Sequence, residues 1–341
     1  ALWRQLGEPV REGYALATLA NMSIGVGHSA AAEHTLAEAI ALLEAQLPGP
    51  ELAFAYRMRA AVAFLDHDYR PSIAWAEMSI GVAEAVGETG AVLSARNLIG
   101  SALLFLDYAR GCDYLEDNQA RAAAAGRTSI VGHAYANLGS AACELYHLDR
   151  AERYLGEGIP YAIEHDLDRY RFYMTAWLAV TQLRLGQWAA VPATAEQVLG
   201  RPGVSIPSRI TALAALGLLR ARRGDAGVAE ALDEALALTR ELSSLHRVAL
   251  VRAARAEAAW LAGDAASAAR EAAAAYDLAV AKRHPWFAGE LAYWLWRAGV
   301  PSPTAVPSPT GRGLGRGSST PEEPSPSPSQ WAGEQSVPSP T

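Results

Sequence analysis

Histidine and cysteine have the widest chemical range in this 341-residue sequence, because they bind metals and act as bases or nucleophiles. Neither forms a local motif. The sequence has no His-Glu-x-x-His and no Cys-x-x-Cys, and His28 and His34 are six residues apart, on different faces of a helix. Serine, histidine and aspartate are numerous, but no nucleophile elbow arranges them. The sequence therefore predicts no catalytic residue, no metal site and no cofactor.

The two cysteines, Cys112 and Cys143, cannot form a disulfide framework, which favours a reducing cytoplasm. Cys112 lies on the repeat pattern described next, and Cys143 lies four residues after Gly139 on the same expected helix, so we expect both to be small buried residues. His28, His67 and His147 fall at or next to expected turns, which we interpret as repeat geometry.

A small residue recurs at intervals of 38 to 40 residues, which is the mark of a solenoid. Its seven occurrences are Ala20, Ala60, Gly100, Gly139, Ala179, Gly217 and Ala256. A second small or slim residue follows each by 12: Ala32, Ser72, Cys112, Ala151, Val191, Ala229 and Ala268. We expect each unit to be two antiparallel helices that cross closely at this pair.

The turns are clearest late in the chain, at Gly224-Asp225-Ala226 and Gly263-Asp264-Ala265. Glycine takes the left-handed conformation that ends the first helix, and aspartate caps the second. A larger residue at the crossing would wedge the helices apart. We therefore expect Gly139→Leu to cost roughly 1–3 kcal/mol and Glu144→Gln to stay within about 0.5 kcal/mol.

Composition agrees with an all-α protein, because alanine contributes much of the 51% hydrophobic share and β-branched runs are scarce. A net charge of −7 argues against nucleic-acid binding and against docking on anionic lipid. No uninterrupted apolar run approaches the ~18 residues of a membrane span. We expect a cytoplasmic protein without membrane or direct nucleic-acid contact.

The chain divides into two parts: an array over residues 1–299 and a Pro/Ser/Gly-rich tail over residues 300–341. The tail repeats Pro-Ser-Pro-Thr and has almost no apolar periodicity, which predicts disorder. The last helix of the array, about residues 286–298, has no partner helix after it. This feature and the absence of an initial Met suggest a piece of a longer protein.

The fourth unit resembles a tetratricopeptide repeat, with Tyr135, Leu138 and Gly139 on the first helix and Ala151 and Leu155 on the second. The usual period is about 34 residues and this one is about 39. Longer repeats of this kind resemble the superhelical sensor region of MalT-like, LuxR-family ATP-binding bacterial transcription regulators. The stretches that carry this resemblance are Leu2–Gly13, Pro48–Ala53, Arg201–Ser205, Ala221–Asp225, Ala256–Asp264 and Pro285–Gly299.

The resemblance implies a right-handed α-superhelical solenoid of about seven tetratricopeptide-like hairpins. It also implies a non-enzymatic interaction and sensor domain in signal transduction. The family's ATPase and helix-turn-helix modules are absent from this sequence, which has no G-x-x-x-x-G-K-[ST] loop. A free-standing scaffold that assembles partner proteins is the alternative, and an enzyme is the weakest choice.

The concave groove of such an array is the expected binding surface, for a protein or peptide segment or for a small inducer. We expect the positions six before, three before and one after the first small residue to face it. The resulting groove candidates are Tyr14, Asn21, Asn97, Ser101, His133, Ser140 and Tyr173. The alternative interpretation is that these side chains pack between units or solvate the inner wall.

Overall fold

The structure is a computed structural model that describes residues 2–25, 29–240 and 244–301. Those residues form helices and no strand. A short helix, α1 (Leu2–Gln5), precedes the array. The first helices of the hairpins are α2 (Pro9–Gly25), α4 (Pro50–Leu65), α6 (Thr89–Leu106), α8 (Thr128–Glu144), α10 (Asp168–Arg184), α12 (Ile206–Arg223) and α14 (Leu245–Leu261). The second helices are α3 (Ser29–Glu44), α5 (Tyr69–Ala85), α7 (Tyr108–Ala124), α9 (Leu148–Glu164), α11 (Val191–Leu199), α13 (Val228–Thr239) and α15 (Ala265–Ala281).

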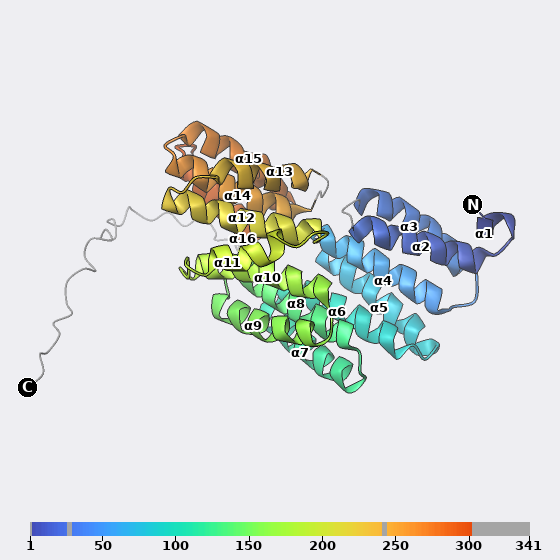
Figure 1. Ribbon diagram of the computed structural model, residues 1–341. Helices are drawn as coiled ribbons and strands as arrows, with labels where there is room; N and C mark the ends of the chain where they lie inside the picture. The colour runs from blue at the N-terminus through green and yellow to red at the C-terminus, as the bar shows by residue number, and fades with distance from the viewer. Residues whose placement is uncertain (1, 26–28, 241–243, 302–341) are drawn as a thin grey trace, which may run out of the picture. The chain divides into compact units, whose positions relative to one another are not determined.

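Within the described chain these helices make seven hairpins, and α16 (Pro285–Arg297) follows them. Each hairpin packs on the next, and the colours in Figure 1 follow the chain order along the array. The first helices also contact one another from α2 through to α16. The all-α, tetratricopeptide-like array of about seven hairpins is therefore confirmed.

The small residues lie where the helices of a hairpin cross. A Cβ added to Gly139 would lie 2.5 Å from Cδ2 of Leu155, and one added to Gly217 would lie 2.7 Å from Cδ2 of Leu232. One member of the second series is wrong, because Ala229 is exposed and Ala231 is the buried residue near Gly217.

The shift of the buried position from Ala229 to Ala231 follows from the turn between α12 and α13. Gly224 and Gly227 both have positive φ, 73° and 83°, and Gly227 rather than Asp225 is the N-cap of α13. The turn is therefore longer than expected. In the next hairpin the expectation is confirmed, because Asp264 caps α15 and accepts a hydrogen bond from the Ser267 amide at 2.9 Å.

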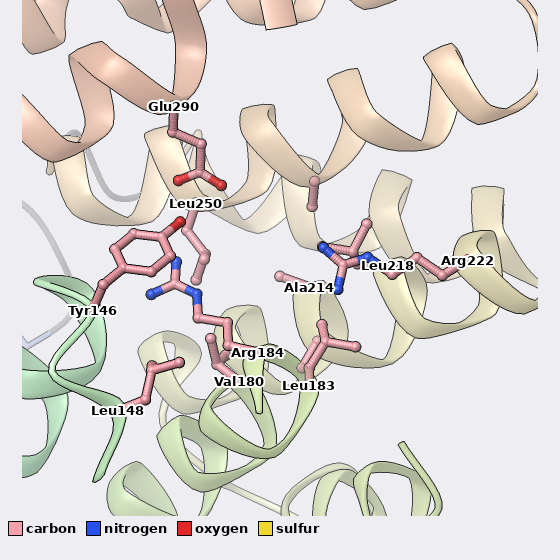
Figure 2. Close-up of a pocket in the computed structure, with 12 residues that line it drawn as sticks. Tyr146, Leu148, Val180, Leu183, Arg184, Ala214, Leu218, Arg222, Leu250 and Glu290 are labelled. Atoms are coloured by element: carbon pink, nitrogen blue, oxygen red, sulfur yellow. The ribbon is translucent and has the colours of Figure 1, made fainter. Parts of the chain in front are cut away.

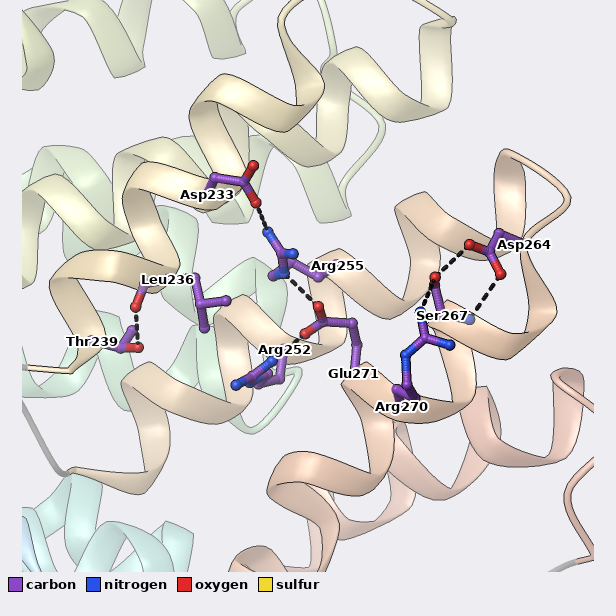
Figure 3. A network of polar contacts seen from close by, with 9 residues as sticks. All are labelled: Asp233, Leu236, Thr239, Arg252, Arg255, Asp264, Ser267, Arg270 and Glu271. Atoms are coloured by element: carbon purple, nitrogen blue, oxygen red, sulfur yellow. Dashed lines mark hydrogen bonds and ion pairs between the residues drawn. The ribbon is translucent and has the colours of Figure 1, made fainter.

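A network of ion pairs joins three helices late in the array (Figure 3). Arg255 of α14 pairs with Asp233 of α13 and, through Nε at 2.8 Å, with Glu271 of α15. Arg252 pairs with the other carboxylate oxygen of Glu271 at 2.5 Å. These contacts hold consecutive second helices to the first helix that lies between them in sequence.

Both cysteines are buried, as expected. By length and composition, one helix in the described ranges, α6, could cross a membrane, and 56% of that stretch is buried inside the protein. It contacts α5, α7 and α8, which is the environment of a core helix. The expected tail, from residue 302 on, lies outside the described residues.

Candidate functional site: two cavities on the inner face

The first helices surround a shared inner face, because one cavity collects side chains from hairpins far apart in sequence. This cavity, here called the histidine cavity, has a volume of about 40 Å³. It is lined by Phe64, His67, Tyr69, Ser101, Leu104, Phe105, Asn137, Ser140, Ala141, Glu144, Tyr173 and His246. These residues come from the α4–α5 turn and from α5, α6, α8, α10 and α14, together with the end of α4.

His67 connects the second hairpin to the seventh. Its Nδ1 lies 2.7 Å from the Tyr69 hydroxyl, and its Nε2 lies 3.3 Å from Nδ1 of His246. Burial, together with the nearby His284 and Lys282, lowers the pKa of His67 to about 3. Burial also holds the pKa of His246 well below its usual value. Both imidazoles are therefore neutral at pH 7 and can exchange a hydrogen bond instead of repelling each other.

His284 and Glu144 form a second long-range contact. His284 is the N-cap of α16, and its Nδ1 accepts a hydrogen bond from the Phe287 amide at 3.3 Å. Its proton must then sit on Nε2, which donates to Glu144 Oε1 at 2.8 Å. Both side chains are buried. Glu144 is thus a buried contact residue between α8 and α16. The small cost expected for Glu144→Gln stays a prediction.

A second and larger cavity, here called the arginine cavity, has a volume of about 210 Å³. Its polar lining is Tyr146, Arg184, Arg222 and Glu290. Its apolar lining is Leu148, Val180, Leu183, Ala214, Ala215, Leu218, Leu250 and Ala254. Figure 2 shows the Glu290 carboxylate above the Tyr146 hydroxyl and the Arg184 guanidinium, with Arg222 entering from the opposite side.

The two guanidinium groups are only partly used by the protein. Arg184 Nη1 donates to the Cys143 carbonyl oxygen at 2.6 Å, and its guanidinium carbon lies 4.2 Å from the centre of the Tyr146 ring. Arg222 binds Glu257 through Nε at 2.5 Å and Nη2 at 3.0 Å. Burial raises the pKa of Glu290, and the nearby Arg184 opposes that shift.

The structure places three of the seven groove candidates together: Ser101, Ser140 and Tyr173 line the histidine cavity. Asn137 Nδ2 donates to Ser101 Oγ at 2.6 Å. His133 lies elsewhere, with its ring stacked on Tyr170 at 5.4 Å. Burial lowers the pKa of His133 to about 4.

The other three candidates lie outside both cavities. Asn97 is fully buried, donates to the Ile130 carbonyl and accepts from Asn118, so its side chain packs between neighbouring hairpins, as in the alternative interpretation. Tyr14 is half exposed beside Phe54, at a ring distance of 5.5 Å, and Asn21 is exposed on α2. Ligand binding by the seven candidates stays a prediction.

The charged residues that line the cavities were missed in the sequence analysis, although their position in the repeat is a signal for some of them. The position five after the small residue holds Glu144, Arg184 and Arg222 in successive units. The position seven after it holds glycine at Gly186, Gly224 and Gly263, each with positive φ. At that same position stand His67 and Tyr146, with φ of 61° and 62°, and each lines one cavity.

No group of three or more His, Cys, Asp or Glu side chains within the described part of the chain could hold a metal ion. The three histidines and Glu144 around the histidine cavity therefore form no metal site. Their arrangement suits hydrogen bonding between neutral rings and ring packing, with ring centres of His67 and His284 5.5 Å apart.

Comparison with known proteins gives no family assignment. No family model matches the chain, and no curated protein matches it. One solved structure with similarity is the P58(IPK) TPR domain, at 14% sequence identity and a TM-score of 0.31, covering 86% of this chain and 78% of that chain.

Proposed function

We propose that this chain is a non-enzymatic binding domain whose inner face takes a small inducer or a short segment of a partner protein. The observation that carries the proposal is that the walls of both cavities come from hairpins far apart in sequence. Such walls meet only when the array has one particular curvature. A ligand between them would therefore favour that curvature over others.

The inner face supports a compact ligand better than a long extended peptide. Two contacts bridge it, between His67 and His246 and between His284 and Glu144. A peptide lying along the whole array would have to break both contacts. A small molecule, or the end of a peptide, could occupy the arginine cavity while both remain.

We further propose that the domain acts as the sensor part of a MalT-like, LuxR-family ATP-binding transcription regulator in bacteria. Support for this context comes from the resemblance of the stretches quoted above. Ligand-dependent curvature would then bias an attached ATPase between resting and assembled states. A free-standing scaffold is the alternative. The flanking DNA discriminates them, because an upstream in-frame P-loop ATPase supports the regulator and a start codon just before Ala1 supports the scaffold.

Ligand binding can be tested without knowing the ligand. The chain is screened by thermal shift against a diverse set of metabolites and of random short peptides. Each hit is repeated on Ser140→Phe, which fills the histidine cavity, and on Ala254→Phe, which fills the arginine cavity. Ala229→Phe is the matched control, because Ala229 is exposed on α13. Circular dichroism checks that each variant is folded.

The proposal predicts at least one ligand that raises the Tm of the wild type and of Ala229→Phe but not that of a filled variant. A ligand whose effect survives both fillings, or a screen with no ligand, would contradict it.

A further inference from the structure

The arginine cavity contains charges of opposite sign that do not neutralise each other directly. Arg184 and Glu290 both line it, yet no Arg or Lys among the described residues forms an ion pair with Glu290. The polar neighbour of Glu290 is the Tyr146 hydroxyl (Figure 2). A carboxylate and a guanidinium that share a cavity without contact can both be satisfied by one ligand that reaches each of them.

Unused hydrogen-bond donors remain on both arginines. Arg184 uses Nη1 for the Cys143 carbonyl, which leaves Nε and Nη2. Arg222 uses Nε and Nη2 for Glu257, which leaves Nη1. A guanidinium has five N–H donors and prefers carboxylate or phosphate oxygens. The cavity can therefore bind an anionic group at its arginines.

The charge balance selects among ligands. Arg184 and Arg222 are balanced by Glu290 and Glu257, so the site as a whole is neutral. A ligand with only a negative charge would meet the Glu290 carboxylate, and a ligand with only a positive charge would meet the two guanidinium groups. A ligand with one charge of each sign avoids both repulsions, and it leaves the site neutral.

The rest of the wall is apolar. Leu183, Leu218 and Leu250 line the cavity together with Val180 and small alanines. The volume of about 210 Å³ is far more than the ~10–15 Å³ that one water needs. The site therefore has room for an apolar group as well as for the two charged groups.

We propose that the arginine cavity binds a small zwitterion with an apolar group, the chemical class of apolar α-amino acids. The ammonium lies at Glu290, the carboxylate lies at Arg222 and Arg184, and the apolar group lies against the leucines. This assignment rests on the proposed function, in which the inner face binds a ligand.

The first test compares four probes on the full chain by calorimetry at pH 7.5. l-Leucine and l-phenylalanine carry both charges, 4-methylpentanoate lacks the ammonium, and 3-methylbutylamine lacks the carboxylate. We expect saturable binding of at least one amino acid and at least tenfold weaker binding of each single-charge analogue. An analogue that binds as tightly as the amino acids, or the absence of binding by both amino acids, would overturn the assignment.

The second test removes the negative charge of Glu290 from the cavity wall. Glu290→Gln should weaken binding of the amino acid at least tenfold and leave 4-methylpentanoate bound as tightly as before, or more tightly. General damage to the fold would weaken both probes and could not reverse the preference. Glu234→Gln is the matched control, because Glu234 of α13 pairs with Arg209 and neither residue lines the cavity. Unchanged amino-acid binding in Glu290→Gln contradicts the assignment.

The two proposals fail in different ways. If the thermal-shift screen returns a ligand of another class whose effect is lost in Ala254→Phe, the inner face binds ligands and only the zwitterion assignment is wrong. If no ligand loses its effect on the Tm in either filled variant, both proposals are wrong.

Discussion

At the scale of single residues, His67 and Tyr146 link local backbone geometry to the inner face most directly. Both have positive φ without being glycine, a conformation that costs an L-residue roughly 1–2 kcal/mol. Four other units have glycine at the same position in the sequence, and the three of these that the structure describes have positive φ. Strained residues of this kind tend to cluster at functional sites, and these two line the two cavities. Asp166 and Arg283 also have positive φ but line neither cavity, so the position of His67 and Tyr146 on the cavity walls, and not the strain alone, connects them to the inner face.

His67 gives a pH prediction. Its pKa is about 3 in the folded chain and about 6.5 when unfolded, so the unfolded chain binds the extra proton between these values. The stabilisation is complete above pH 6.5 and is lost as the pH falls toward 3. Between pH 7.5 and 5, this single group removes about 2 kcal/mol from the free energy of unfolding.

The measurement is urea unfolding at pH 7.5 and pH 5.0. In His67→Asn, where asparagine tolerates the positive φ, the loss between the two pH values should be smaller by about 2 kcal/mol. His34→Asn, at an exposed position, is the control. An unchanged loss in His67→Asn would show that His67 is not buried in the neutral form.

A pair of glycines tests the close packing of the hairpins. A Cβ on Gly111 would lie 2.4 Å from the backbone nitrogen of Leu104, which cannot move aside as a side chain can. Gly111→Ala should cost roughly 1–3 kcal/mol. Gly156→Ala, at an exposed helical position with open space, should stabilise by about 0.5–1 kcal/mol. Chemical denaturation measures both, and equal effects would contradict the packing described here.

At the scale of helices and turns, most of the architecture could be predicted because each hairpin depends on local signals. Small residues marked the crossings, and Gly263-Asp264 marked a turn and a cap. The hairpin of α12 and α13 could not be predicted, since its turn uses two left-handed glycines and shifts the buried position from Ala229 to Ala231. The repeat period of 38 to 40 residues does not reveal so small a lengthening of one turn.

Two aspartates at N-caps give a matched comparison. Asp264 accepts the Ser267 amide at the start of α15, whereas Asp68 at the start of α5 makes no capping hydrogen bond. Asp264→Ala should destabilise the chain by about 1 kcal/mol, and Asp68→Ala should stay within about 0.5 kcal/mol. Thermal unfolding of both variants checks this, and a larger loss for Asp68→Ala would contradict the assigned caps.

At the scale of the whole array, the site could be predicted only in part. Ser101, Ser140 and Tyr173 followed from the register of single units. The meeting of His67 with His246 and of His284 with Glu144 did not, because these partners are 179 and 140 residues apart. Their distance depends on the rotation between successive hairpins, summed over several units. A small uncertainty in each rotation becomes a large one in position.

Glu144 tests the contact between α8 and α16. Glu144→Leu leaves the buried Nε2–H of His284 without its acceptor, which should cost roughly 1–3 kcal/mol. Glu144→Gln keeps an acceptor oxygen and should lose less. Urea unfolding of the two variants at pH 7.5 gives the comparison. If glutamine and leucine were equally harmless, the contact would not form in solution.

The central claim is that a ligand bound on the inner face stabilises the contacts between hairpins that are far apart in sequence. Hydrogen exchange with mass spectrometry tests it directly, on the full chain with and without the strongest ligand from the thermal-shift screen. We predict slower exchange at the α4–α5 turn, at the α8–α9 turn around Tyr146 and at the start of α16, with little change in α5 and α7. Protection confined to the second helices, with those turns unchanged, would contradict the claim.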